Sequence, residues 1–346
     1  MSIVEVAKRA GVSTATVSFV INNKPHVSPE TAHAVWKAIA ELGYTPPPPG
    51  NRRGPRPGKV TIRRTNRIAL LAWGLHRSVL YSPVYMDVLH GVESALNERG
   101  LTMVLHHLSP QQQITSESLG GKVDGAVLFT PEENTAIKRA LRIIPCVRVM
   151  GAVEEDNWCD HVSYNNDMIG GFAARLLLEH GHRNCAYLGD GDGVVGTRGF
   201  AFQETLNEKQ VTVTMFGSPN LFIKTADFHQ VNQDIIRILV DRLLACSPRP
   251  TGLFVPTDML TASVYLQLLE RGVRPGVDIE IVSCNNERAI LAGLHPQPAV
   301  IDIHAEAIGR QAVEQLLWRL EHRNHPRMNI VIDPALLAND TALPQQ

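Results

Sequence analysis

The sequence has few cysteines, no long apolar run and no recognisable targeting segment. Its five cysteines are scattered, odd in number and never spaced as Cys-x-x-Cys, which argues against a disulfide framework and against a zinc site. No apolar run approaches the ~20 residues that span a membrane. The N-terminus lacks a basic stretch followed by an apolar one, so we expect no secretory signal. These absences predict a cytoplasmic protein without a structural metal.

The sequence also lacks the signatures of common catalytic sites. It has no Gly-x-Ser-x-Gly nucleophile elbow. The run 189–193, rich in glycine and aspartate, has neither the spacing of a dinucleotide-binding fingerprint nor that of a calcium loop. The histidine pairs His106-His107 and His180/His182 have no third ligand at metal spacing, and we interpret them as surface or capping residues. We therefore expect a protein that is not an enzyme and that uses no cofactor or metal.

What the sequence does have is an uneven distribution of charge. Residues 1–65 contain ten lysines and arginines against three glutamates, a net charge of +7, whereas the whole chain of 346 residues has a net charge of -1. The remaining residues therefore carry a net charge of −8. A basic N-terminal part on an acidic body predicts that only the N-terminal part contacts phosphate. The length predicts two or three folding units.

Residues 1–45 have the pattern of three short helices. Apolar residues recur at helical spacing from Ile3 to Ala10, and Gly11 suits the positive φ of a tight turn. Ser13 is a good N-cap for a second helix, and Ser28-Pro29 is a typical start for a third. Two helices joined by a tight glycine turn, with hydroxyls in the first turn of the second helix, predict a helix-turn-helix that reads the DNA major groove.

A family resemblance rests on these same residues, namely 3–18, 22–23, 27–28, 31 and 41–44. They resemble the headpiece of the LacI/GalR family of bacterial transcriptional regulators. The resemblance implies that the phosphate backbone is contacted mainly by Ser13, Thr16, Ser18 and Asn22. It also implies that base edges are faced by Thr14, Ala15 and Phe19.

Phe19 stands where many members of the family carry arginine. Arginine can bond guanine through two hydrogen bonds, whereas phenylalanine can only contact a thymine methyl group or pack. Since Thr14 and Ala15 are also short, we expect modest direct base readout by this helix. The alternative is that Phe19 belongs to the core of the head.

Residues 46–65 form a linker rich in proline and arginine. Most family members have here a hinge helix that wedges a leucine into the minor groove, and this chain has neither the helix-forming residues nor the leucine. Its Arg-Gly-Pro-Arg-Pro run is instead similar to an AT-hook. We therefore predict that Arg52, Arg53 and Arg56 read the narrow minor groove of A·T-rich DNA. The alternative is a disordered spacer that touches phosphates without preference.

Residues 66–346 alternate between strand patterns and helix patterns. Such alternation predicts parallel sheets with helices on both faces, and two doubly wound halves form a ligand crevice between their strand C-termini. Landmarks at 162–166, 170–171 and 308–312 also resemble the family and imply a periplasmic-binding-protein-like effector domain. The implied subdomains are 66–161 with 288–321, and 162–287 with 322–346.

By resemblance, four residues are candidates for contact with an effector. Asp258 opens a helix at the crevice and could accept hydrogen bonds from ligand hydroxyls; the alternative is a helix N-cap. Tyr85 stands where the family often places an aromatic that stacks on the ligand ring; the alternative is a core aromatic. The family usually carries arginine three residues before a Gly-Phe pair. Before Gly199-Phe200 that position is Gly196, and the adjacent Arg198 is a substitute that would project differently.

The fourth candidate is Asn285, which replaces a common aspartate and can both donate and accept hydrogen bonds. Fewer fixed charges favour a neutral sugar or polyol over an anionic ligand. We therefore predict a carbohydrate effector. The predicted fold is an all-α helix-turn-helix head followed by an α/β body of two doubly wound subdomains.

We predict a bacterial transcriptional repressor that lies on the nucleoid when it is bound to double-stranded DNA. It should act as a homodimer on a palindromic operator, because one short helix reads too few base pairs. A small molecule in the crevice would shift the subdomain next to the heads. The alternative is a solute-binding module or small-molecule enzyme of the same α/β class with an accessory DNA-binding head. The missing signal peptide and the missing catalytic motif count against this alternative.

Overall fold

The computed structural model describes most of the chain in two compact units. The described residues are 2–22, 27–46, 65–73, 82–108, 122–130, 135–142, 144–151, 158–190, 193–224 and 229–337. The units are Met1–Arg63 and Arg64–Gln346, and each is considered by itself. Nearly all of the linker, including Arg52, Arg53 and Arg56, lies outside the described residues.

The N-terminal unit consists of the helices α1 (Ile3–Ala10), α2 (Thr14–Ile21) and α3 (Pro29–Leu42). Each helix begins at a serine whose hydroxyl accepts a backbone N–H of the first turn, and the Ser2 cap forms a capping box with Glu5. The apolar stripes of the helices meet in one small core, made of Val6, Ala7, Val17, Val20, Ile21, Val35, Ala38 and Ile39.

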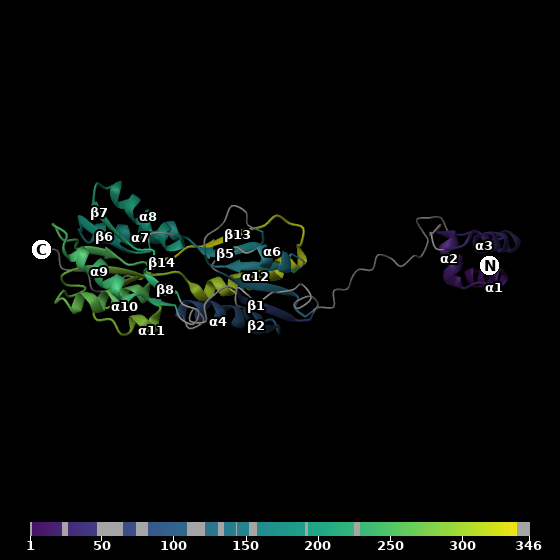
Figure 1. Ribbon diagram of the computed structural model, residues 1–346, viewed down its shortest axis with the longest axis horizontal. Helices are drawn as coiled ribbons and strands as arrows, with labels where there is room; N and C mark the ends of the chain where they lie inside the picture. The colour runs from purple at the N-terminus through teal and green to yellow at the C-terminus, as the bar shows by residue number, and fades with distance from the viewer. Residues whose placement is uncertain are drawn as a thin grey trace. The chain divides into compact units, whose positions relative to one another are not determined.

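The larger unit contains two six-stranded sheets (Figure 1). Sheet A has the order β13-β5-β4-β3-β1-β2, and all its strands are parallel. Its strands are β1 (Arg67–Trp73), β2 (Thr102–Leu108), β3 (Gly125–Phe129), β4 (Cys146–Val149), β5 (Asp160–Tyr164) and β13 (Asn329–Ile332). The helices α4 (Pro83–Asn97) and α12 (Ala305–Glu321) pack on one face, and α6 (Thr135–Leu141) packs on the other.

Sheet B repeats this topology in the order β14-β12-β11-β10-β6-β7, with only β14 antiparallel to its neighbour. Its strands are β6 (Asn184–Gly189), β7 (Thr212–Gly217), β10 (Gly252–Phe254), β11 (Glu280–Asn285), β12 (Ala299–Asp302) and β14 (Ala335–Leu337). The helices α7 (Asn166–Glu179) and α8 (Gly193–Asn207) cover one face, and α9 (Gln233–Leu244) and α10 (Asp258–Leu269) cover the other (Figure 1). The short elements are α11 (Arg288–Leu291) and the hairpin of β8 (Phe222–Lys224) and β9 (His229–Val231).

The predicted fold class is confirmed, because both sheets are doubly wound and their central strands are buried on both faces. In each sheet the chain reverses its winding at the first strand, at β1 in sheet A and at β6 in sheet B. Open α/β sheets bind ligands at such switch points, outside the carboxyl ends of the strands.

The structure corrects the predicted subdomain boundaries. Strand β5 belongs to sheet A, so the first crossing falls at Asn165 rather than near residue 161. Strands β11 and β12 both belong to sheet B and α12 packs on sheet A, so the second crossing falls near His304 rather than near 288. The third crossing lies between β13 and β14 rather than near 322. The errors arose because the periodicity of a single element does not specify which of the two sheets a strand joins.

Candidate functional site

Helix α2 presents one polar face to solvent in the N-terminal unit. Val17, Val20 and Ile21 are buried in the head, whereas Thr14, Ala15, Phe19 and Asn22 are exposed and Ser18 is half-buried. With 100° between successive residues, these five lie within one arc of the helix. The candidate DNA-contacting residues on this arc therefore form one continuous surface.

Side-chain hydrogen bonds fix the polar groups at both ends of α2. The Ser13 hydroxyl accepts the Thr16 backbone N–H at 3.1 Å, and the two side-chain hydroxyls lie 2.9 Å apart. At the other end, the Asn22 amide donates to the Ser18 carbonyl oxygen at 2.8 Å. Ordered hydroxyls beside the N–H groups of a helix N-terminus suit contact with phosphate.

Phe19 is 47% exposed and lies on the solvent-facing arc of α2. The alternative that Phe19 belongs to the core of the head is therefore wrong. Its exposure leaves the ring accessible to a partner that meets this arc of the helix. Its shape and chemistry fit the apolar contact with a thymine methyl group predicted from the sequence.

In the larger unit, Arg198 lies at the carboxyl ends of the strands of sheet B. Its side chain is buried, with 2% exposure. The guanidinium donates to Asn166 Oδ1 at 2.9 Å, to the Pro256 carbonyl oxygen at 2.6 Å and to Asn285 Oδ1 at 3.2 Å, and it lies 4.9 Å from the centre of the Tyr164 ring. Arg198 thus joins α8 to the ends of β5, β10 and β11, where the two subdomains meet.

The packing of α7 on α8 explains why Arg198 reaches this position. A side chain at Gly170 would overlap the Arg198 carbonyl oxygen and the Ala201 methyl group, so the two helices meet backbone to backbone there. Phe202 is fully buried, whereas Phe200 is 59% exposed. The inward aromatic is therefore Phe202, preceded by Ala201 in place of glycine, and Arg198 stands three residues before Ala201. With Phe202 as the inward aromatic, Arg198 has the three-residue spacing that the family shows, whereas the sequence predicted Gly196 at this position.

Asp258 is fully buried, and its carboxylate is bonded within the protein. One oxygen accepts the Ser283 hydroxyl, and the other accepts the Glu287 backbone N–H at 2.6 Å. The N-cap of α10 is Thr257, so Asp258 is not the N-cap. Burial raises the pKa of Asp258 to about 6, against the lowering effect of these hydrogen bonds. Asp258 thereby holds the end of β11 and the turn after it, where Asn285 and Asn286 have positive φ.

Tyr85 is a core aromatic, since its ring is 2% exposed and meets the Phe129 ring edge-on at 4.8 Å between centroids. The ring is therefore not available for stacking on a ligand in this structure. Its hydroxyl is buried and has no hydrogen-bond partner within the described ranges, and Glu287 Oε2 is in the same situation. Such atoms are costly unless something pairs with them.

A cavity of about 560 Å³ opens between the two subdomains. One part of its wall comes from α4 and the first turns of α12, and the other from the ends of β11 and β12. Its polar lining residues are Asp87, Asn285, Asn286, Arg288, Asp302, His304, Glu306 and Arg310. This volume and this mixture of donors and acceptors are typical of sites for small polar ligands.

Several residues of this region were not identified from the sequence. Glu287, Asp302 and His304 belong to no motif, because they come together only through the turn after β11 and the crossing after β12.

His182 was interpreted as a surface or capping residue, but it is buried and bonds Glu280 Oε2 at 2.8 Å and the Thr251 hydroxyl at 2.8 Å. Among the described residues no group of three or more His, Cys, Asp or Glu is arranged to hold a metal.

Glu287→Gln is expected to stabilise the protein at pH 8 and to change its stability little at pH 4.5. Burial, with repulsion from Asp258, raises the pKa of Glu287 from 4.5 to about 7. The folded protein therefore keeps a proton that the unfolded chain releases, and wild-type stability falls as pH rises from about 4.5 to about 7. The free energy of unfolding of the variant relative to wild type should rise by about 2–3 kcal/mol across this window, measured by urea unfolding.

Glu208→Gln is the matched control, because Glu208 is exposed at the end of α8. Its free energy of unfolding relative to wild type should change by less than about 0.5 kcal/mol over the same pH range. A Glu287→Gln difference that is equally flat would contradict the assignment of a buried, protonated carboxyl.

Comparison with known proteins identifies the family of the chain. Residues 2–47 match the model of bacterial regulatory proteins of the lacI family, and residues 174–341 match that of the periplasmic binding protein-like domain. The HTH-type transcriptional repressor PurR of Edwardsiella ictaluri is 28% identical over 350 residues, covering 97% of this chain and 95% of the relative. The chain belongs to the LacI family of bacterial regulatory proteins.

Solved structures of LacI-family proteins have the same architecture as this chain. A transcriptional regulator CelR–cellobiose complex is 25% identical, covers 99% of both chains and has a TM-score of 0.63. The lac repressor dimer bound to operator and an anti-inducer is 19% identical, covers 99% of both chains, has a TM-score of 0.64 and supports the fold alone. The full-length relatives are transcriptional regulators, and the expectation that this LacI-family chain is a regulator and not an enzyme is confirmed by them.

Proposed function

We propose that this LacI-family regulator is a repressor that binds a palindromic operator as a homodimer and is controlled by a neutral sugar or polyol. The sugar binds between the two subdomains of the larger unit. The observation that carries the proposal is the crevice, where Arg198 joins the ends of three strands and a polar cavity takes its walls from both subdomains. A ligand that contacts both subdomains stabilises one arrangement of the subdomains relative to another. This shift can alter DNA binding.

The lining chemistry supports a polyhydroxylated effector. Amides at Asn285 and Asn286 offer donors and acceptors, and the unpaired Tyr85 hydroxyl and Glu287 Oε2 offer further partners if the crevice rearranges around a ligand. In this proposal Arg198 and Asn285 contact the effector, Tyr85 contributes its hydroxyl rather than its ring face, and Asp258 positions the turn that carries Asn285. Among related solved structures, CelR is in complex with cellobiose, and a LacI family transcriptional regulator from Enterococcus faecium has bound ribose.

The exposed face of α2 supports the DNA-binding part of the proposal. Thr14, Ala15 and Phe19 contact base edges, and the ordered hydroxyls with Asn22 contact phosphates. One helix of eight residues reads too few base pairs, so two copies are needed. Leu266 and Leu269 are each 52% exposed on α10, which is consistent with a face covered by a second copy.

The repressor acts in the cytoplasm, and we place it on the nucleoid when it is bound to DNA. Within the described ranges no helix has the length and apolar character needed to cross a membrane.

The linker prediction extends this proposal to the minor groove. Arg53→Ala with Arg56→Ala is expected to weaken binding to sites with an A·T-rich centre by about tenfold more than binding to sites with a G·C-rich centre, because the narrow groove of A·T-rich DNA attracts arginine. Affinities for the two duplexes at one salt concentration measure the effect. An equal loss on both centres would show that the arginines contact phosphate without preference.

The proposed function is tested by DNA affinity in the presence of a panel of neutral mono- and disaccharides. The full-length protein should bind duplex DNA with an affinity that falls steeply with salt, since phosphate contacts release counterions. One sugar should change operator affinity by about 5–150-fold. A salt-independent DNA affinity would contradict the regulator assignment. A response to anionic ligands alone would contradict the neutral effector.

A further inference from the structure

A second cavity, of about 620 Å³, lies at the amino ends of the strands of sheet A, at the opposite end of the strands from the effector crevice. Cys146 and Asp160 are the first residues of β4 and β5, and both line this cavity. Because the strands of sheet A are parallel, their carboxyl ends face the crevice and their amino ends face this cavity. The cavity is therefore separate from the site proposed for the sugar.

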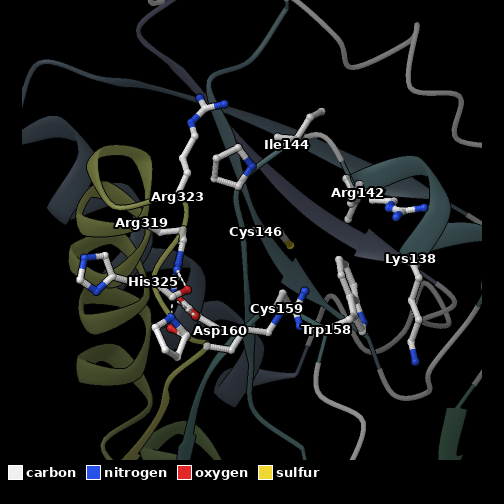
Figure 2. Close-up of a pocket in the computed structure, with 14 residues that line it drawn as sticks. Lys138, Arg142, Ile144, Cys146, Trp158, Cys159, Asp160, Arg319, Arg323 and His325 are labelled. Carbon is white, nitrogen blue, oxygen red and sulfur yellow. Dashed lines mark hydrogen bonds and ion pairs between the residues drawn. The ribbon is translucent and has the colours of Figure 1, made fainter.

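The walls of this cavity are strongly basic. Among its basic residues, Lys138 and Arg142 come from α6 and its end, whereas Arg319 and Arg323 come from α12 and the segment after it (Figure 2). The cationic lining residues are Lys138, Arg142, Arg319, Arg323 and Arg327, with His325 beside them. Among the described lining residues, Asp160 is the single carboxylate. The lining thus has an excess of four positive charges on a protein with an overall net charge of -1.

Arg319 and Asp160 form the structural base of this cavity. Arg319 Nη2 and Nε donate to the two oxygens of Asp160 at 2.6 and 2.8 Å. The same guanidinium donates to the carbonyl oxygens of His322, His325 and Pro326. These bonds satisfy Arg319 and fix the segment after α12, which carries Arg323 and Arg327. The charge available to a ligand therefore comes from other side chains.

Three arginines supply that charge. Arg142, Arg323 and Arg327 are exposed at the cavity, and no ion pair joins any of them to another described residue. Arg142, which follows α6, and Arg323, which follows α12, lie on two sides of the cavity (Figure 2). Arg327 also follows α12 in the sequence. Guanidinium groups along the wall of a cavity can recognise phosphate, whose oxygens accept paired N–H bonds.

The rest of the wall is apolar and includes a half-buried indole. Trp158 lies beside Cys159, and Ile144 and Cys146 line the same cavity (Figure 2). Pro145 is a further apolar lining residue. An indole at the edge of a basic cavity offers a face on which a planar base can stack. The cavity combines this surface with a cluster of phosphate-binding groups, within the range of volumes typical of ligand sites.

We propose that this cavity binds a nucleotide, with its phosphates at Arg142, Arg323 and Arg327 and its base against Trp158. Helix α12 connects this site with the crevice, because residues 305–307 line the crevice cavity and Arg319 lines the basic one. A helix of this length is about 25 Å long and rigid, so it provides a physical link between the two sites. The regulator would therefore have a second input of different chemistry from the sugar.

Titration calorimetry of the full-length protein with ADP tests the proposal. ADP should bind at one site per chain, and adenosine should bind at least about tenfold more weakly, because the arginines contact phosphate. Arg142→Gln with Arg327→Gln should weaken ADP binding by at least about tenfold. Both residues are exposed, so the thermal unfolding midpoint should not change. Trp158→Ala should weaken ADP binding but not pyrophosphate binding.

Arg139→Gln with Arg249→Gln is the matched control, since it removes two exposed arginines that do not line the cavity. It should leave ADP affinity within about twofold of wild type. Equal losses in both double variants, an ADP affinity unchanged by Arg142→Gln with Arg327→Gln, or no heat with ADP at millimolar concentration would each overturn the proposal. Loss of affinity for a non-operator duplex without loss for ADP would assign the arginines to the DNA backbone and would also overturn it.

Discussion

Asp160→Ala is expected to lower the free energy of unfolding of the larger unit by about 3–5 kcal/mol. Asp160 is buried and accepts two hydrogen bonds from Arg319, one from the Gln315 amide at 2.6 Å and one from the Met328 backbone N–H at 3.0 Å. The substitution leaves the Arg319 guanidinium buried without its counter-charge. The same bonds join β5 to α12 and to the start of β13, so one carboxylate holds three segments together. Urea unfolding followed by circular dichroism measures the loss.

Two further variants separate the buried charge from the loss of a side chain. Asp234→Ala removes a carboxylate paired with Arg237 at the surface, where the side chains are 81% and 57% exposed, and should cost less than about 1 kcal/mol. Asp160→Leu combined with Arg319→Met should recover at least about half of the loss, because no unpaired charge remains. A loss of under about 1 kcal/mol for Asp160→Ala would contradict the role given to this pair.

Arg198→Met is expected to abolish the response to the effector and to destabilise the larger unit by about 3 kcal/mol. The variant leaves the Pro256 carbonyl oxygen and the Asn166 side-chain oxygen without the donor they share in a buried site. It also removes the cation that lowers the pKa of Asp258, a group that holds the turn carrying Asn285. The proposed effector contact of Arg198 and the support of the turn near Asn285 would therefore be lost together.

The measurement is operator affinity with and without the sugar found to act on the wild-type protein. The sugar should change wild-type affinity by the full coupling factor and should leave the affinity of Arg198→Met unchanged within about twofold. Arg175→Met on α7 is the control, because Arg175 is exposed and its guanidinium lies over the Phe172 ring, outside the crevice. A full sugar response in Arg198→Met would remove Arg198 from the effector site.

The head could be predicted from sequence in detail because its signals are local. Ser13 and Ser28 are N-caps, Gly11 and Gly43 adopt the left-handed conformation, and the buried residues of α2 are those that the periodicity indicates. The exposure of Phe19 was left open, because one residue at the border of a helical stripe can face either way. The packing of α1 and α3 decides it.

The effector region could be predicted only in part, because its residues are brought together by tertiary structure. The family's arginine position was predicted at Gly196 because the Gly-Phe pair at 199–200 matches the motif, whereas the buried phenylalanine is Phe202. The burial of Asp258 depends on Ser283 and Glu287, more than 20 residues away in the sequence. The basic cavity gave no sequence signal, because its arginines are distributed over α6 and the segment after α12.

The central claim is that two copies of this LacI-family chain read a two-fold symmetric DNA site through the exposed face of α2. Selection of bound duplexes from a random pool by the full-length protein tests it most directly. The account predicts enrichment of one palindromic motif, and replacement of Phe19 by alanine should change the preferred bases of both half-sites equally. Enrichment of a single half-site without two-fold symmetry, or a motif unchanged by Phe19→Ala, would contradict it.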